Sequence, residues 1–322
     1  MDGEFPRPSP AAGILDLQQP VARNLPLVLA SPHSGTEYPA DFLAASRLDP
    51  VALRRSEDSF VDELFGAAPR LGAPLLSARF PRAYVDVNRE AYELDPSMFA
   101  DALPKFVNAG SPRVRMGLGT IARIVASGEE IYAKKLRFEE AQRRIERLYR
   151  PYHRTLRGLV EETEALFGGC LLVDCHSMPS GADSRCEKSG ADIVLGDCHG
   201  ASCAPQFVEA ARRFLVERGF AVAINAPYAG GFTTGHYGRP SVRRHALQIE
   251  VNRALYMNER DYERKAYFPR LVQDLAELVD RLGRVAQECL VGQLEDRRGA
   301  GRPIDAPLLH SHLKRMQLRR RR

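Results

Sequence analysis

The chain has 322 residues, 44% of them hydrophobic, which is enough for one large α/β domain or two small ones. No apolar stretch reaches the roughly 20 residues of a membrane span, and the opening Met1-Asp2-Gly3-Glu4 lacks a signal-peptide pattern, so a cytoplasmic protein without membrane contact is expected. The net charge of +5 comes from the last ten residues, and the nearly neutral body favours a solvated tail over a nucleic-acid-binding one.

Periodicity and composition predict one catalytic α/β domain over residues 25–292, between an irregular lead-in at 1–24 and a basic, disordered tail at 293–322. Short apolar runs flanked by Gly, Pro, Asp or Asn predict strands at 25–31, 75–77, 83–87, 170–174, 192–195, 221–225 and 247–251. Helical spacing predicts helices at 59–65, 138–166 with a kink at Pro151, 205–217 and 269–287. Strands interleaved with helices favour a mixed, largely parallel sheet flanked by helices.

Two segments between these elements are expected to cover a ligand site. Segment 93–128 lacks a clean period and contains several prolines and glycines, which predicts a long loop excursion. Segment 230–240 is dense in glycine and too irregular for a hairpin turn, and such loops often close over ligands. The chain has neither a Gly-Lys-Ser/Thr phosphate loop nor a Gly-x-Gly-x-x-Gly motif after a strand, which argues against nucleotide binding.

Three apolar runs each end in a residue suited to metal-dependent hydrolysis. His33 follows residues 27–30, His176 follows 171–174, and Glu250 ends the run 247–249. Open α/β sheets place their chemistry at the carboxyl ends of strands, so these three side chains are expected to converge. A catalytic zinc takes three protein ligands and leaves one position for water, so a third ligand is required. The nearby candidates are Glu37, Glu57 and Asp58.

Glu250 and the Asn88-Arg89 pair have further predicted roles. Glu250 lies in an apolar strand, where an ionised carboxylate is costly unless paired, and this suits a general base with a raised pKa. The structural alternative is an internal ion pair with an arginine such as Arg253. Asn88 and Arg89 end another predicted strand, where an amide and a guanidinium can grip a carboxylate, although a surface ion pair is equally compatible with their types.

Taken together and in order, these motifs resemble those of the N-formylglutamate amidohydrolases, a family related to zinc carboxypeptidases and aspartoacylases. The resemblance extends over about residues 26–257 and includes Ser-Pro-His-Ser-Gly at 31–35 and the segments 58–64, 86–89, 149–153, 174–177, 230–240 and 248–256. It implies a fold like that of zinc peptidases (phosphorylase/hydrolase-like), with His33 and His176 as zinc ligands and Glu250 as catalytic base. The family's usual acidic ligand position is Thr36 here, so Asp58 is the expected third ligand, ahead of Glu57 and Glu37.

The resemblance also implies an activity: zinc-dependent hydrolysis of the formyl amide of N-formyl-L-glutamate, or a similar N-acyl amino acid, in histidine degradation. One zinc ion is implied, with another divalent metal as the alternative. For the two substrate carboxylates, Arg89 with Asn88 is expected to act together with Arg82 or Arg239, and His236 or an arginine would hold the oxyanion. The competing hypotheses are a zinc hydrolase of another N-acyl amino acid or peptide-like amide, and a non-catalytic binding protein on this scaffold.

Overall fold

A seven-stranded sheet runs through the part of the chain that this computed structural model describes, residues 13–181 and 190–291. The strand order is β1-β3-β2-β4-β7-β5-β6. Four of the neighbouring pairs are parallel, and β1–β3 and β5–β7 are antiparallel, which confirms a mixed, largely parallel α/β sheet. The strands are β1 (Leu15–Gln18), β2 (Leu27–Ser31), β3 (Leu75–Ala78), β4 (Cys170–Met178), β5 (Ile193–Gly196), β6 (Val222–Ile224) and β7 (Arg244–Asn252).

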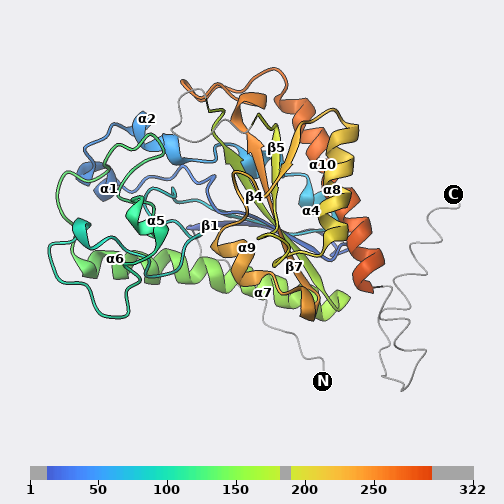
Figure 1. Cartoon of the computed structure of the whole chain (residues 1–322), viewed down its shortest axis with the longest axis horizontal. Coiled ribbons are helices and arrows are strands. Elements are labelled where there is room, and N and C mark those ends of the chain that lie inside the picture. Colours follow the sequence, from blue (N-terminus) through green and yellow to red (C-terminus); the bar gives the residue numbers. More distant parts are fainter. Residues whose placement is uncertain (1–12, 182–189, 292–322) are drawn as a thin grey trace, which may run out of the picture.

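Helices cover both faces of the sheet (Figure 1). One apolar cluster joins the sheet to α3 (Val61–Leu64), α4 (Ala68–Leu71), α8 (Pro205–Glu217) and α10 (Phe268–Ala286). A second cluster joins the other face to α6 (Phe138–Arg144), α7 (Arg150–Phe167) and α9 (Phe232–Tyr237), and includes buried residues of α1 (Ala40–Ala45), α2 (Pro50–Leu53) and the neighbouring loops. Shorter turns are the 3₁₀ helices Arg54–Ser56, Pro96–Met98, Pro240–Val242 and Arg253–Leu255, the one-turn helix α5 (Pro112–Arg115), and the π-helical turns Ile145–Tyr149 and Gln287–Val291.

The alternation of side chains along β4 and β7 determines where the buried polar side chains lie. Successive residues of a strand point to opposite faces, and on β4 the α7-facing positions begin with the apolar Cys170 and Leu172. Towards the carboxyl end the same positions become polar, with Asp174 followed by His176. On β7 the pattern repeats, and Glu250 lies beside His176 in the register of the two strands. The sheet therefore carries a buried polar group at one end of one face.

The helix predicted at 138–166 is confirmed, with an internal irregularity near Pro151. Helix α6 passes through a π-helical turn, Ile145–Tyr149, into α7, and Gly168 ends α7 with a φ of 73°. Proline has no N–H to donate to the preceding turn, which accounts for an irregular turn at this place. The Tyr149 hydroxyl donates to the carbonyl of Arg89 at 2.8 Å, and His153 Nε2 lies 2.8 Å from the carbonyl of Val87. This helix therefore fixes the backbone of residues 87–89.

Two sequence predictions about strands are wrong. Residues 83–87 form no strand, because the Tyr84 amide bonds back to Pro81 and the Asp86 amide donates to Thr120 of the excursion at 2.8 Å. Their apolar alternation reflects burial against loops rather than against a sheet neighbour. In the lead-in, where irregular structure was expected, Leu15–Gln18 forms an antiparallel edge strand on β3. Residues 1–12 and the predicted tail at 293–322 lie outside the described residues.

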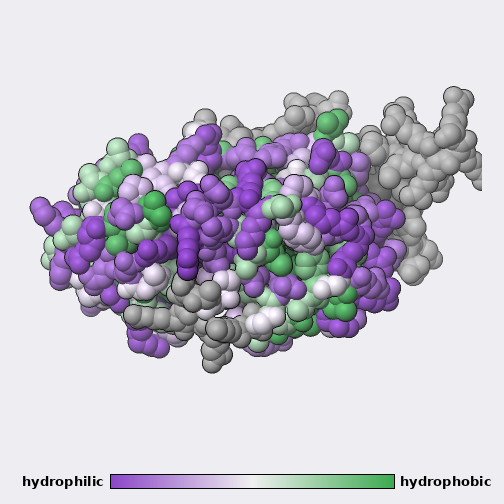
Figure 2. Space-filling model, turned by 90° about the horizontal axis from the view of Figure 1, so that it is seen from above, coloured by the Kyte–Doolittle hydropathy of each residue, from purple (hydrophilic) through white to green (hydrophobic). Residues whose placement is uncertain are grey.

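None of the described helices is long and apolar enough to cross a membrane. Figure 2 shows a face that is mostly hydrophilic, with apolar residues in small separate groups.

The excursion at 93–128 is held by a close backbone approach that depends on Gly119. The Thr120 amide donates to the Glu93 carbonyl at 2.8 Å, and a Cβ on residue 119 would overlap that carbonyl oxygen. We expect Gly119→Ala to lower the free energy of unfolding by about 1–3 kcal/mol, the usual cost of overpacking. Chemical denaturation measures the change, with Gly110→Ala as the control because nothing lies within 4 Å of its added Cβ. Equal unfolding midpoints for the two variants would contradict the close approach.

Candidate functional site

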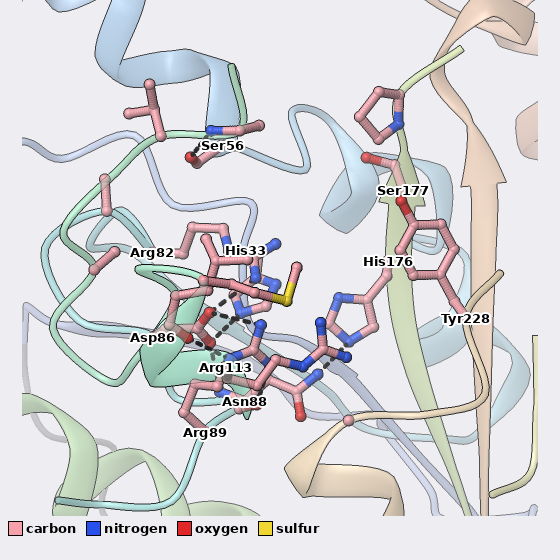
Figure 3. A pocket seen from close by; sticks show the side chains of 18 of the residues that line it. His33, Ser56, Arg82, Asp86, Asn88, Arg89, Arg113, His176, Ser177 and Tyr228 are labelled. Carbon is pink, nitrogen blue, oxygen red and sulfur yellow. Dashed lines mark hydrogen bonds and ion pairs between the residues drawn. The ribbon is translucent and has the colours of Figure 1, made fainter. Parts of the chain in front are cut away.

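A cavity of about 450 Å³ opens where the carboxyl ends of β4 and β7 meet the excursion (Figure 3). Its volume lies in the range of small-molecule sites. His176 and Ser177 of β4 form one wall in this view, while His33, Asp86 and several arginines face them from the other side. As the sequence predicts, residues of the excursion also line it: Arg113, Met116, Leu118, Ala122, Ile124, Val125, Ala126 and Gly128.

Three buried side chains, His33, Asp58 and His176, meet beside this cavity. Their ligand atoms lie within 4.8 Å of one another. Asp58 Oδ2 is 3.3 Å from His33 Nδ1 and 3.0 Å from His176 Nδ1. The Asp58 amide also donates to the carbonyl of His33 at 3.0 Å, so the loop after β2 and the loop before α3 hold each other in register. The two δ nitrogens thus face a single carboxylate oxygen.

The far nitrogen of each imidazole is turned to another carboxylate. His33 Nε2 lies 2.8 Å from Asp86 Oδ1, and His176 Nε2 lies 3.0 Å from Asp174 Oδ1. Histidines that bind metals typically donate one ring N–H to a carboxylate and present the other nitrogen to the ion. Within the described residues, His33 Nδ1 is buried and has no hydrogen-bond partner. A buried imidazole nitrogen left over in this way, next to a second imidazole and a carboxylate, fits a divalent metal ion.

Charge interactions within the cluster are strong. Burial raises the pKa of Asp58, but the hydrogen bond from His176 and the nearby imidazole of His33 outweigh it and hold the pKa well below its usual value. For His176, burial lowers the pKa, but the carboxylates of Asp174 and Asp58 raise it well above its usual value. Without a metal the cluster is therefore an imidazolium–carboxylate pair. A divalent cation would take the place of the proton, since metal ligands must be deprotonated.

Of the three acids considered as third ligand, only Asp58 reaches the imidazoles. Glu57 is buried, but it turns away to the hydroxyls of Tyr38 and Ser59, at 2.7 and 2.8 Å. Glu37 is exposed and pairs with Arg79. The sequence predicted a helix over residues 59–65, and the structure starts α3 at Val61, after a 3₁₀ turn that ends at Ser56 and has Glu57 as its C-cap. This break lets the two neighbouring acids point in different directions.

Glu250 lines the cavity next to His176, as the paired strands require. Burial raises its pKa to about 7. Its hydrogen-bond partner is Gln248, whose Nε2 donates to Oε1 at 2.9 Å. The alternative ion pair with Arg253 is not formed, because Arg253 donates to Asp58 Oδ1 at 3.1 Å instead. A carboxyl group with a pKa near neutrality, at the edge of a metal-type cluster, has the properties of a general base.

The predicted substrate residues Asn88, Arg89 and Arg82 all line the cavity. Asn88 accepts a hydrogen bond from the Thr233 amide at 2.8 Å and places Nδ2 3.2 Å from His176 Nε2. Arg89 donates through Nε to the carbonyl of Leu118 at 2.8 Å. Arg82 pairs with Asp86 Oδ2 at 2.8 Å, which fixes its guanidinium beside the histidines. These three side chains bring amide and guanidinium donors to one side of the cluster.

The other two predicted substrate residues, His236 and Arg239, do not line the cavity. Part of the glycine-dense segment 230–240 folds into α9, where His236 is exposed and stacks on Phe232 with ring centroids 4.8 Å apart. Arg239 is exposed just after this helix. What reaches the cavity from the segment is its beginning, Gly230 and Gly231. A Cβ on residue 231 would overlap the Asn88 amide, which explains the need for glycine there.

Three further residues, Asp86, Asp174 and Gln248, orient the histidines and Glu250, and none of them was predicted as a site residue from the sequence. For two of them, the sequence contains a pattern that could have predicted the role. Asp174 and Gln248 each lie two residues before a predicted site residue, so strand alternation places both members of each pair on the same face. Asp86 reaches His33 from 53 residues away through a turn, and no local pattern indicates that contact.

Comparison with known proteins finds relatives of one kind. The family model described as N-formylglutamate amidohydrolase matches residues 25–257. An N-formylglutamate deformylase of Pseudomonas putida is 30% identical over 240 residues, which cover 73% of this chain and 83% of the relative. An N-formylglutamate deformylase of Pseudomonas aeruginosa is 31% identical over 243 residues, with the same coverage.

Solved structures give the same picture. The crystal structure of N-formylglutamate amidohydrolase from Ralstonia eutropha JMP134 superimposes with a TM-score of 0.81 and 41% sequence identity. The match covers 86% of this chain and 99% of that one. A protein of Agrobacterium tumefaciens, gene product Atu2144, shares the fold with a TM-score of 0.53 at 18% identity.

Proposed function

This chain belongs to the N-formylglutamate amidohydrolase family, and from that premise we propose that it hydrolyses the formyl amide of N-formyl-L-glutamate to formate and glutamate. The membership makes the protein an amidohydrolase, so the hypothesis of a non-catalytic binding protein is not carried forward. The observation that carries the proposal is the location of Glu250, which lines the same cavity as two metal-type histidines and a set of arginines.

We propose that His33, Asp58 and His176 hold one zinc ion through their two Nδ1 atoms and a carboxylate oxygen. Two imidazoles and a carboxylate are a ligand set found in zinc hydrolases, with the fourth position left for water. When bound, such an ion supplies a strong positive charge that acidifies a water molecule and polarises a carbonyl group. Asp86 and Asp174 orient the two imidazoles for this role.

Glu250 is assigned the proton transfers. Its carboxylate, with a pKa raised to about 7 by burial, accepts a proton from the attacking water, whose oxygen forms the new bond to the formyl carbon. The carbon–nitrogen bond then breaks, and Glu250 returns the proton to the departing nitrogen. Gln248 donates to Oε1 and so holds the group in place through both steps. The products are formate and the free amino group of glutamate.

The arginines and Asn88 are assigned to binding and orientation. Arg89 binds a carboxylate of the amino acid, with Asn88 beside it. Arg82 is fixed next to the cluster by Asp86 and provides the donor for the negative charge that develops on the formyl oxygen. His236 takes no part in this step, because it stacks on Phe232 outside the cavity lining.

Formate release from a panel of N-acyl glutamates tests this proposal. We expect turnover of N-formyl-L-glutamate, with N-acetyl- and N-succinyl-L-glutamate hydrolysed at least about tenfold more slowly, since a difference of about 1.4 kcal/mol in transition-state binding gives a factor of ten. Product amino acid and formate are measured together in the same reaction. Equal or faster turnover of the acetyl or succinyl substrate would replace N-formylglutamate with another N-acyl amino acid.

A further inference from the structure

Four arginines line the cavity, and they differ in how many protein partners they have: Arg82, Arg89, Arg113 and Arg253. Arg253 is bound to Asp58 at 3.1 Å, and Arg82 to Asp86 at 2.8 Å. Arg89 uses Nε and one terminal nitrogen on backbone carbonyls, and its other terminal nitrogen lies 3.8 Å from Asp86 Oδ2. Among the residues that the structure describes, the Arg113 guanidinium has no hydrogen bond and no ion pair. A cation with no protein partner at the rim of a ligand cavity has its full hydrogen-bonding capacity available for a ligand anion.

The backbone of Arg113 is tied to the side chain of Arg89 through Leu118. It belongs to α5, the single turn in the excursion, and its carbonyl accepts from the Leu118 amide at 2.9 Å. The Leu118 carbonyl in turn accepts from Arg89 Nε at 2.8 Å. Ser111 caps the turn by accepting from the Val114 amide at 3.1 Å, and its own hydroxyl bonds to the buried Glu93. The Arg113 backbone and the Arg89 guanidinium therefore belong to one hydrogen-bonded unit.

The positive charge of Arg113 also acts on the Arg89 guanidinium. Burial lowers the pKa of Arg89, and the positive charges of Arg82 and Arg113 lower it further, although Asp86 acts in the opposite direction. Figure 3 shows Arg82, Arg89 and Arg113 gathered on the side of the cavity that faces His176. Like charges that face one cavity favour an anion with more than one charge between them.

We propose that Arg113 binds the side-chain carboxylate of the substrate while Arg89 binds the α-carboxylate, so that Arg113 selects N-formyl amino acids with an acidic side chain. This inference rests on the proposed function and extends it from the reacting amide to the substrate side chain. From the sequence, Arg82 or Arg239 was expected to bind the second carboxylate. Arg82 is already committed to Asp86 beside the histidines, and Arg239 does not line the cavity.

The charges around the site are consistent with such a dianion. Four arginines stand against four carboxylates, those of Asp58, Asp86, Asp174 and Glu250. These charges cancel when the acids are ionised and the imidazoles are neutral, as metal ligands must be, and a divalent metal would add an excess of two positive charges. Two carboxylates on the substrate would compensate this excess. A neutral side chain would leave the charge of Arg113 without a partner on the substrate.

The test compares N-formyl-L-glutamate with N-formyl-L-glutamine, which differ only in the charge and donors of the side-chain end. We expect the wild type to prefer the glutamate substrate. In Arg113→Met we expect kcat/KM for N-formyl-L-glutamate to fall about ten- to a hundredfold, the effect of losing a hydrogen bond between charged groups, mainly through KM. The value for N-formyl-L-glutamine should change little, so the preference collapses. Arg113→Lys keeps the positive charge and should retain part of the preference for the glutamate substrate.

Arg115→Met is the matched control, because Arg115 lies on the same helical turn but bonds to the Gly110 carbonyl and does not line the cavity. It should keep the wild-type preference. The inference is overturned if Arg113→Met keeps the preference for glutamate over glutamine, or if the wild type shows none. Absence of formate release from both substrates in the wild type would instead reject the proposed function, and the inference with it.

Discussion

Replacing Glu250 with glutamine is expected to lower kcat for formate release by about 10²- to 10⁴-fold, the contribution typical of general acid–base catalysis. Glutamine has nearly the same shape, and its amide oxygen can still accept the hydrogen bond from Gln248. The amide cannot take a proton from water, however, so the chemical step loses its base. The metal content of the variant should stay at the wild-type level, because Glu250 is not one of the three clustered ligands.

Glu209→Gln provides the matched control for this experiment. Glu209 is an exposed carboxylate on α8, where it pairs with Arg212. Its loss should leave kcat unchanged. If Glu250→Gln turned over N-formyl-L-glutamate at the wild-type rate with its metal in place, the assignment of Glu250 as the base would have to be abandoned.

Removal of a histidine from the cluster is expected to remove the metal as well as the activity. In His176→Ala, one of three ligand atoms is lost, and the carboxylates of Asp58 and Asp174 remain buried without their shared partner. We expect metal binding to weaken by more than the roughly 10- to 100-fold that loss of an outer hydrogen-bond partner costs. Formate release should fall to background. Elemental analysis of the purified variant and competition with a chelator measure the loss.

His199→Asn is a suitable control for this variant, since His199 is exposed and asparagine tolerates its positive φ of 56°. Thermal unfolding then shows whether the alanine variant is folded. A folded His176→Ala that retained a full equivalent of tightly bound metal would show that the ion, if any, is held elsewhere.

The ends of the buried strands could be predicted from the sequence, because the residue types change there. Parallel strands covered on both faces appear as apolar runs, and the change to polar residues at their carboxyl ends marked His176 and Glu250. The same reasoning placed His33 after β2. Asp58 was predicted as the third ligand from the family-like spacing of its segment. In the structure, the break between the 3₁₀ turn and α3 lets its side chain point to the histidines.

Contacts that depend on irregular backbone could not be predicted. Residues 83–87 alternate like a strand, yet they pack against the excursion and deliver Asp86 to His33 from a turn. Arg113 lies in a segment without any period, so nothing in the sequence separates it from Arg115, two positions further on. Only the fold shows that one of them lines the cavity and the other bonds to a backbone carbonyl.

The excursion has a functional consequence beyond lining the cavity. Its backbone is tied to the segment that carries Arg89, through the bonds of Asp86 to Thr120 and of Arg89 to Leu118. A substrate held between Arg89 and Arg113 would therefore be positioned by one connected unit rather than by two independent loops. Such preorganisation lowers the entropic cost of aligning the formyl carbon with Glu250.

The central claim is that His33, Asp58 and His176 hold a divalent metal ion that hydrolysis at Glu250 requires. It is tested most directly by measuring the metal content of the purified protein together with formate release from N-formyl-L-glutamate, before chelation, after chelation, and after the metal is restored. The account predicts about one equivalent of metal per chain, loss of activity in step with loss of the metal, and recovery on its return. Full activity in protein shown to be free of metal would contradict it.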